Sequence, residues 1–562
     1  MTTADRRAAL ALLTLALLVL AAGYGLRDPW PADEPRFVLV AKQMVDSGDY
    51  LFPHRGAELY PDKPPIYFWL LSLAYGLVGS WRGSFLLPSL LSALGTLALV
   101  YDLGRRLWSP RAGFWAATAV LVSLQFVYQA KRAQIDPTLV FMTTFAFYGL
   151  CRHVLQGPHW RWYLAACFAA GLGVVTKGVG FLPLLALLPF ALMARRGWQG
   201  LAPVPAGSGL RWWAGGLAFL AAIALWLGPV LAVGLTSGNP EHEEYLRNIL
   251  FKQTAQRYAD PWHHHEPFWY FGEIIALFWA PFSLALPWLL RPWREAWRAR
   301  DARVWLPLAW FGLVIVFFSL SAGKRDMYIL PALPALALAA APYLDDISRR
   351  RGFRLLVLAF TALLSLVLAA GGLMALFGDP SFEAKLVAER GLGQEARWLW
   401  WMLVGVGGSG LLAVLVAAAA KLRGALAACA WLLAALWCGY GFVVHPLLDD
   451  ENSARKVMQA ARDLAGPGTT IGLVDWKEQN LLQAVGPMAE FGFRADPLVQ
   501  LARARAWLAQ APGERVLMLQ SSKDLACVDT AAGSQRVGTA NRRVWWLVDE
   551  RALAGCEAPT AP

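Results

Sequence analysis

Charged residues are scarce in this sequence of 562 residues. Asp, Glu, Lys and Arg make up 16% of it, whereas about a quarter of a typical soluble protein is charged. Hydrophobic residues make up 57%. Apolar runs of roughly 18 to 22 residues recur, and an α-helix of that length crosses about 30 Å of hydrocarbon. The composition therefore excludes an ordinary soluble enzyme and predicts an α-helical polytopic membrane protein.

Other patterns are also missing. No Cys-x-x-Cys pair occurs among the six cysteines, so no cysteine-based metal site is expected. Neither an internal repeat nor a low-complexity tract is present, and the inverted repeats of many transporters are not seen. Four cysteines lie in apolar runs and are interpreted as small hydrophobic residues. Cys527 and Cys556 lie in the C-terminal tail and could form a disulfide if that tail is periplasmic.

The formal net charge of +12 could indicate a nucleic acid partner. The arginines, however, lie in short clusters between apolar runs, as the positive-inside rule predicts for cytoplasmic loops. Contact with membrane lipids explains the charge, and no nucleic acid partner is expected. The first apolar run follows Arg6 and Arg7 and shows no convincing cleavage site, so we expect an uncleaved span with a cytoplasmic N-terminus.

Thirteen segments are expected to cross the membrane, at about residues 8–26, 84–104, 112–130, 137–155, 160–176, 180–194, 212–236, 268–290, 303–320, 328–344, 354–376, 398–420 and 424–444. Ile66–Val78 is apolar but short for a crossing. If it lies along the membrane surface as a juxtamembrane helix, six arginine-containing clusters fall in the cytoplasm; if it crosses, they fall outside. We therefore interpret it as a juxtamembrane helix.

This topology places the first loop, residues 27–82, and the loop at 237–267 on the outer face of the membrane. From about Asp449 the composition changes to that of a soluble protein, with helical and strand-like segments. We expect a transmembrane domain over residues 1–448 and a small periplasmic α/β domain over residues 449–562.

Carboxylates in two outer loops are candidates for catalysis. Asp33 and Glu34 follow the first span, and Asp136 follows the third. Ionisable groups beside a bilayer usually face a cavity, where one carboxylate can act as a base while another orients a substrate. Ordinary interfacial charge is the alternative. Asp136 would also serve as a helix N-cap before a proline, whereas Asp33 has no obvious helix to cap.

Positive side chains collect on the same outer face, where the topology rule does not require them: Arg36, Lys63, Lys177, Arg257, Lys324 and Arg325. Arg and Lys bind phosphate, so an anionic ligand at the membrane surface is the simplest explanation. General attraction to anionic lipid headgroups is the alternative.

The sequence His263-His264-His265-Glu266 precedes an aromatic group. Adjacent histidines cannot all face one metal ion. One of them, such as His264, could still bind a divalent ion together with a carboxylate from another loop, such as Asp62. An interfacial polar stretch before an aromatic belt is the alternative.

Six motifs occur in a fixed order: Asp33-Glu34, Tyr60-Pro61-Asp62-Lys63, Ile135-Asp136-Pro137, Thr176-Lys177-Gly178, His265-Glu266-Pro267-Phe268 and Gly323-Lys324-Arg325-Asp326. This order resembles the GT-C membrane glycosyltransferases. Within them it is similar to the bacterial branch related to protein O-mannosyltransferases, which includes the aminoarabinose transferases of lipid A modification. The resemblance covers roughly residues 1–345. It implies a GT-C fold with about thirteen transmembrane helices, periplasmic juxtamembrane helices and a small α/β C-terminal domain.

The resemblance also implies roles for single residues. Those matching catalytic positions are Asp33, Glu34 and Asp136. Those expected to hold the donor phosphate are Lys63, Arg257, Tyr328, Lys177 and Arg36. Those expected to contact the substrate are Tyr60, Asp62, Lys324 and Arg325. The family's histidine best matches His264, with His263 and His265 as alternatives.

The reaction implied is an inverting transfer of a sugar from undecaprenyl phosphate to a periplasmic-side acceptor by a monomeric enzyme. The sugar expected is 4-amino-4-deoxy-L-arabinose and the acceptor a lipid A phosphate, with a divalent metal ion as the one candidate cofactor. Two departures from the family pattern are Phe37 in place of Tyr and Lys324–Met327 in place of Lys-Leu-Pro-Thr. Because the second lies near the donor, the alternative is hexose transfer (mannose, glucose or galacturonate) to protein, O-antigen or core sugar. A polyprenyl-lipid transporter is a second alternative.

Overall fold

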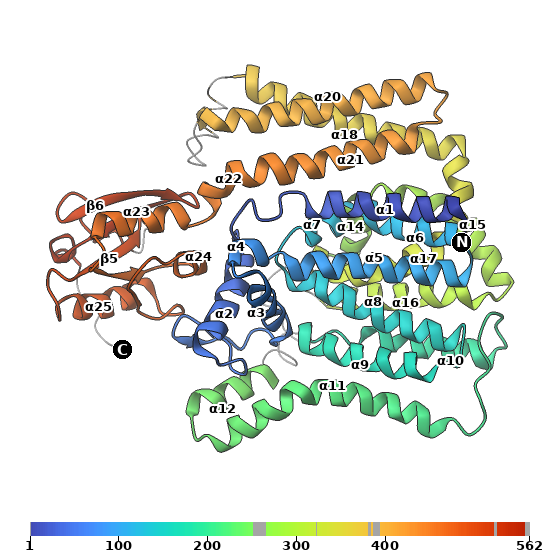
Figure 1. Cartoon of the computed structure of the whole chain (residues 1–562), viewed down its shortest axis with the longest axis horizontal. Helices are drawn as coiled ribbons and strands as arrows, with labels where there is room; N and C mark the ends of the chain where they lie inside the picture. The colour runs from blue at the N-terminus through green and yellow to red at the C-terminus, as the bar shows by residue number, and fades with distance from the viewer. Residues whose placement is uncertain are drawn as a thin grey trace.

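The computed structural model describes residues 2–250, 266–321, 323–379, 381, 384–385, 394–521 and 525–556. Long helices run side by side in a bundle, and a β-sheet with its helices lies at one end of that bundle (Figure 1). The N-terminus lies at the opposite end (Figure 1). Helix α1 (Thr3–Ala21) runs from there toward the sheet, so the residues that follow it lie beside the sheet.

The bundle contains these further helices: α5 (Leu87–Leu107), α6 (Pro110–Val122), α7 (Leu124–Ala130), α8 (Ile135–Val154), α9 (Trp160–Lys177), α10 (Leu187–Arg195), α11 (Gly209–Thr236), α14 (Tyr270–Phe278), α15 (Leu286–Arg298), α16 (Ala302–Ser319), α17 (Leu333–Arg349), α18 (Arg351–Phe377), α20 (Arg397–Ala419) and α21 (Ala425–Gly439). In the described part of the chain, seven helices are long and apolar enough to cross a membrane, or up to nine if each bent pair counts as one span. The chain is a multi-pass membrane protein, and the number thirteen stays a prediction.

Two predicted spans are not straight. Residues 112–130 form α6 and α7, which meet at 71°, and residues 268–290 fall on two helices that meet at 100°. At the first break Ser123 has an extended backbone, with ψ 119°. At the second, Pro281 has no N–H to donate, so the helix before it cannot continue through it. Mean hydropathy over a window of residues does not depend on backbone angles, so it does not reveal either break.

Helix α17 lies at the centre of the bundle. Every residue from Leu333 to Ala341 is buried, and five of these nine are alanines. Small side chains allow neighbouring helices to approach closely, which is how helices associate inside a membrane. The 3₁₀ segment Asp326–Ala332 leads into α17 and so has a fixed support.

Residues 27–86, called the first outer segment after their predicted side of the membrane, fold into short elements between the bundle and the sheet (Figure 1). These are α2 (Glu34–Ser47), the hairpin β1 (His54–Arg55) and β2 (Glu58–Leu59), α3 (Ile66–Val78) and α4 (Trp81–Ser84). Helix α3 has 13 residues, about 20 Å, which is too short to span the hydrocarbon. It packs on α2, through contacts such as Phe37 with Tyr67. Both observations agree with the predicted juxtamembrane helix.

Helix α2 corrects one prediction. Asp33 was expected to have no helix to cap, yet it occupies the N-cap position of α2, although its side chain makes no capping hydrogen bond. The apolar run in this helix, Phe37–Ala41, has only five residues and does not stand out in a search for membrane spans. The helix ends at Gly48, whose left-handed backbone, with φ 75°, suits glycine.

In the loop that follows α11, α12 (Pro240–Arg247) packs against the first outer segment. The His242 ring stacks on Phe52 with 3.9 Å between centroids, and Tyr245 meets the same ring edge-on. Helix α12 therefore covers the chain that leads from α2 to α3.

The C-terminal part follows α21 through a π-helical turn at Tyr440–Val444. It contains α22 (His445–Asn452), α23 (Arg455–Ala465), β3 (Thr470–Val474), α24 (Glu478–Leu482), β4 (Met488–Glu490), α25 (Pro497–Leu508), β5 (Arg515–Gln520), β6 (Ser534–Ala540) and β7 (Arg543–Val548). The strand order is β4-β3-β5-β7-β6; β3 is parallel to β4 and β5, and β7 is antiparallel to its neighbours.

A disulfide joins Cys527 to Cys556 across 29 residues, a pairing that the sequence left open. Closing a loop of this size removes unfolded-state entropy worth about 3–4 kcal/mol. We expect a reductant to lower the unfolding midpoint of the C-terminal part of the wild-type protein and to leave the Cys527→Ser/Cys556→Ser variant unchanged. The measurement is thermal unfolding with and without reductant; a wild-type midpoint insensitive to reductant would contradict the prediction.

Candidate active site

Asp33 lies at the start of α2 with a cation one helical turn away. Its Oδ1 is 3.5 Å from Nη1 of Arg36, and the two side chains are 23% and 29% exposed. Nε of Arg36 donates a hydrogen bond of 2.8 Å to Oε1 of Glu478 in α24. Asp33 therefore remains accessible, whereas Arg36, predicted to hold the donor phosphate, is already engaged by a carboxylate.

Glu34 is fully buried, and all its partners lie within the protein. Two guanidinium nitrogens of Arg27 donate to its carboxylate at 2.5 and 2.8 Å. The backbone N–H groups of Trp30 and Ala133 donate at 2.8 and 2.9 Å. Burial alone would raise the pKa of Glu34, but the charge and hydrogen bonds of Arg27 outweigh it and hold that pKa below its ordinary value. A direct catalytic role, as predicted, does not fit this burial.

What Glu34 does instead is connect two loops. One oxygen binds the N–H of Ala133, three residues before Asp136, while the adjacent residue is Asp33. Glu34 thus ties the segment that carries Asp33 to the segment that starts α8. Buried Glu34 therefore holds accessible Asp33 and buried Asp136, the two carboxylates predicted for one cavity, in a common framework.

Asp136, Lys177 and Tyr328 come together from three elements. Nζ of Lys177, at the end of α9, donates to Oδ1 of Asp136, in the first turn of α8, at 2.5 Å. The same ammonium lies 5.3 Å from the centre of the Tyr328 ring, in the 3₁₀ segment before α17. A cation placed over an aromatic face in this way is stabilised electrostatically. Three predicted site residues therefore form one cluster.

Tyr60, Asp62 and Lys63 lie in the turn that leads to α3. Tyr60 is 1% exposed, and the Arg55 guanidinium sits 5.2 Å from its ring centre. Burial, assisted by the charge of Asp62, raises the pKa of Tyr60. Direct substrate contact by the Tyr60 ring, as predicted, does not fit this burial. Asp62 and Lys63 are half-buried.

Residues Lys324–Met327, which differ from the family pattern, are held by hydrogen bonds to other parts of the chain. Nζ of Lys324, a 4% exposed residue, donates to the backbone carbonyl of Glu266 at 2.7 Å. Asp326 accepts a hydrogen bond of 3.1 Å from Gln125. The buried ammonium of Lys324 thus serves the backbone rather than an open site, whereas the neighbouring Arg325 is half-exposed.

Two predicted residues, Arg257 and His264, lie outside the described residues, as do His263 and His265. Among the residues that the structure does describe, no group of three or more His, Cys, Asp or Glu side chains could hold a metal ion. The pairing of His264 with Asp62 stays a prediction.

Sequence reasoning missed a charged network behind Asp33. Asp28, which is 1% exposed, accepts hydrogen bonds of 2.6 and 2.5 Å from Arg455 in α23. Asp449 in α22 accepts from the backbone N–H of Asp28 at 2.8 Å and from the Trp30 indole at 3.0 Å. Asp28 could have been identified because ionisable residues beside a bilayer usually make specific interactions. Its partner Arg455, 427 residues away, could not.

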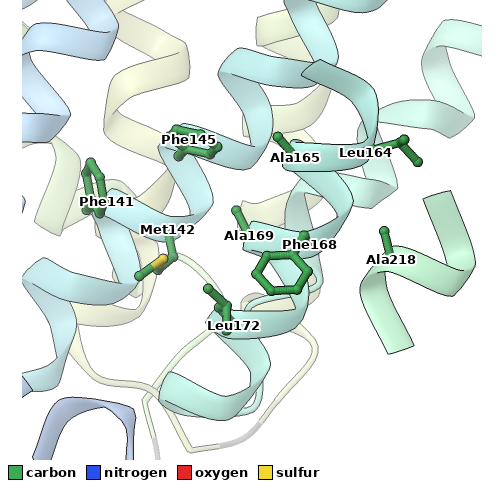
Figure 2. Close-up of a pocket in the computed structure, with 9 residues that line it drawn as sticks. All are labelled: Phe141, Met142, Phe145, Leu164, Ala165, Phe168, Ala169, Leu172 and Ala218. Carbon is green, nitrogen blue, oxygen red and sulfur yellow. The ribbon is translucent and has the colours of Figure 1, made fainter. Parts of the chain in front are cut away.

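An apolar groove of about 500 Å³ runs along α8, α9 and α11 (Figure 2). It is lined by Phe141, Met142, Phe145, Leu164, Ala165, Phe168, Ala169, Leu172 and Ala218. Phe141 is five residues beyond Asp136 on α8, and Leu172 is five residues before Lys177 on α9. At 1.5 Å per residue the groove starts about 8 Å along the helices from that ion pair.

Residues 62–228 match the family model described as dolichyl-phosphate-mannose-protein mannosyltransferase. The whole fold is similar to the crystal structure of ArnT from Cupriavidus metallidurans bound to undecaprenyl phosphate. The TM-score is 0.72 at 21% identity, over 98% of this chain and 99% of that one. The chain thus has the GT-C fold.

Two curated relatives narrow the class. An undecaprenyl phosphate-alpha-4-amino-4-deoxy-L-arabinose arabinosyl transferase of Pseudomonas fluorescens (strain Pf-5) is 32% identical over 386 residues, which are 66% of this chain and 65% of the relative. That of Edwardsiella ictaluri is 30% identical over 393 residues, 66% of each chain. The match thus spans just under two thirds of these relatives. Over that part the chain is similar to these arabinosyl transferases, and its whole fold is similar to that of the ArnT structure.

Proposed function

We propose that the protein is an inverting glycosyltransferase that moves 4-amino-4-deoxy-L-arabinose from undecaprenyl phosphate to a lipid A phosphate. The names of the two curated relatives and the undecaprenyl phosphate bound to the similar crystal structure support this donor. The observation that carries the proposal is the Asp136–Lys177–Tyr328 cluster, tied through Glu34 to the accessible Asp33 and adjoined by an apolar groove.

The chemistry follows from these charges. The acceptor attacks the anomeric carbon in line, that bond forms as the bond to the phosphate oxygen breaks, and the lipid phosphate leaves. Lys63 and Lys177, with Arg257, stabilise the charge that develops on the leaving phosphate. Asp33 takes the proton of a hydroxyl acceptor, or orients an acceptor that is already an ionised phosphate.

The site is proposed to lie on the periplasmic side of a bacterial inner membrane. Residues 1–448 would form the catalytic membrane domain with thirteen spans, and residues 449–562 a periplasmic domain, in a monomer. The N-terminus at the far end of the bundle from the sheet supports this orientation (Figure 1), as do the arginine clusters of the sequence. An odd number of spans places the two termini on opposite sides of the membrane. Labelling cysteines introduced near each terminus with a reagent that does not cross the membrane tests this.

The groove of Figure 2 is proposed to hold part of the polyprenyl chain. Ala165→Phe should raise KM for an undecaprenyl-phosphate donor about tenfold, because displacing roughly two CH₂ groups from the groove loses about 0.8 kcal/mol each. A donor of two isoprene units should be unaffected, since Ala165 lies twelve residues, about 18 Å, from Lys177. Steady-state kinetics with both donors measure this.

Ala418→Phe, at an exposed position of α20, is the matched control and should change neither donor's KM. An equal loss for the short and the long donor in Ala165→Phe would mean that the substitution disturbs packing, and would contradict the assignment of the groove.

The proposed function is tested by transfer with purified protein and defined polyprenyl-phosphate sugars, followed by mass spectrometry of lipid A. A pentosamine added to lipid A supports the proposal. A second candidate is transfer of a hexose to protein, O-antigen or core sugar, which the altered sequence at Lys324–Met327 and the mannosyltransferase family model favour. Turnover of polyprenyl-phosphate mannose without turnover of the aminoarabinose donor would select that candidate.

A further inference from the structure

Glu478 is the first residue of α24, in the C-terminal part, yet it reaches a cation beside Asp33. Its Oε1 accepts the 2.8 Å hydrogen bond from Nε of Arg36 and lies 3.5 Å from Nη1 of Arg55. Glu478 is 5% exposed. A buried carboxylate needs such partners, and both of them come from the first outer segment, more than 400 residues earlier in the chain.

Arg36 is shared unequally between two carboxylates. Its bond to Glu478 is 2.8 Å long, whereas its nearest approach to Asp33 is 3.5 Å, too long for a good charge-assisted hydrogen bond. Burial would lower the pKa of Arg36, but the charge of Glu478 outweighs it and raises that pKa. Glu478 is thus the dominant partner, and Asp33 is contacted by the guanidinium without being held by it.

Other charged and titratable groups surround this pair. On the outer segment they are Arg55, Tyr60, Asp62 and Lys63; on α24 and the turn before it, Asp475 and Lys477; on the buried side of α2, Arg27, Glu34 and Arg132. Lys477 is paired with Asp475 at 3.3 Å, and Glu34 with Arg27. Arg36 thus contacts the carboxylates of Glu478 and Asp33, and its contact with Glu478 is the shorter one.

We propose that Glu478 is a positioning residue: by holding Arg36 it prevents the guanidinium from closing on Asp33, and so keeps the Asp33 carboxylate available to the acceptor. This role rests on the proposed function, since it assigns Glu478 to the same reaction. It makes the C-terminal part a component of the site, although none of its residues touches the substrate.

A purely structural role for Glu478 is the competing explanation, and the same interface supplies a matched control. Glu490 in β4 accepts the backbone N–H of Ala57 at 2.7 Å, next to β1 and β2, without contacting Arg36. The Arg55 guanidinium also lies 3.9 Å from the centre of the Phe493 ring. Glu490 also accepts the backbone N–H of Gly492 at 2.7 Å within the C-terminal part. Because it takes part in the interface through Ala57, Glu490→Gln reports what weakened docking does.

The test is the pH dependence of kcat/KM for Glu478→Gln, Arg36→Gln and Glu490→Gln. In Glu478→Gln one negative charge is lost and Arg36 closes on Asp33. The acid limb, the part of the profile in which kcat/KM rises with pH, should then move to lower pH by about one unit. The value of kcat should fall about tenfold. In Arg36→Gln the cation is lost and the acid limb should move to higher pH. Glu490→Gln should leave the limb in place, and Glu478→Asp should restore part of the wild-type profile.

Shifts of the same sign in Glu478→Gln and Arg36→Gln, or a profile that moves equally in Glu490→Gln, would overturn the proposal. A wild-type protein that transfers no sugar from any polyprenyl phosphate would instead contradict the proposed function, and the catalytic part of this role with it. A double-mutant cycle by thermal unfolding tests the Glu478–Arg36 contact independently of sugar transfer. The effects of Glu478→Gln and Arg36→Gln on stability should be coupled, and those of Glu490→Gln and Arg36→Gln additive.

Discussion

Asp33→Asn is expected to lower the rate of sugar transfer by about 10²–10⁴-fold while the protein remains folded. The fold should persist because the Asp33 side chain caps no helix and its one ion-pair partner stays at 3.5 Å. Asn keeps the size of the side chain but can neither accept a proton nor balance the charge of Arg36. The measurements are initial rates with a saturating donor and the thermal unfolding midpoint.

The control for this substitution is Asp46→Asn near the end of the same helix, where the carboxylate pairs with Lys42 at the surface. That variant should keep its activity, since an exposed i,i+4 pair contributes at most about 0.5 kcal/mol to stability. Wild-type rates in Asp33→Asn would remove Asp33 from the mechanism and leave Asp136 as the remaining candidate carboxylate.

Glu34→Ala is expected to destabilise the protein by about 3–5 kcal/mol, because it leaves the Arg27 guanidinium buried without its partner. Arg27 is 1% exposed and cannot reach water in the folded state. Activity should fall along with stability, since Glu34 also binds the N–H of Ala133 and so holds the loop that leads to Asp136. Thermal and denaturant unfolding in detergent provide the measurement.

Replacing both partners separates charge from packing: Arg27→Met/Glu34→Met should be more stable than Glu34→Ala, because no charge is left buried. The pKa of Glu34 is lowered in the folded state, so its contribution is present above its unfolded value of about 4 and is lost as the pH falls through the lower folded value. The wild type should accordingly lose stability in acid more steeply than the double variant. Equal stability of Glu34→Ala and wild type would refute the buried ion pair.

Much of the fold could be predicted from the length of apolar runs, because a helix must satisfy its own backbone in hydrocarbon. That reasoning located the bundle helices and the short α3. It failed where a break depends on one backbone angle, as at Ser123, or on a proline within an apolar run, as at Pro281. It also missed α2, whose buried face is recognisable only once α3 and α24 are seen to cover it.

For the site, residue type identified which side chains take part in specific interactions, but not whether their role is catalytic, ligand-binding or structural. Asp136 and Lys177 were predicted from separate motifs, and their ion pair follows from α8 and α9 being antiparallel neighbours. Glu34 and Arg36 stand in the same motif as Asp33, yet one is sealed against Arg27 and the other is bound by Glu478. Those partners could not be predicted, since the sequence does not show which distant carboxylate a cation will meet.

The contacts that span more than 400 residues also set an order of assembly. Asp28, Trp30 and Arg36 emerge early in synthesis, whereas Asp449, Arg455 and Glu478 are made 419 to 442 residues later. At about 5–20 residues per second the ribosome needs roughly 20–90 s to cover that distance. During this interval the segment that follows α1 lacks these permanent partners, so the network around Asp28, Trp30 and Arg36 is completed only when the last fifth of the polypeptide arrives.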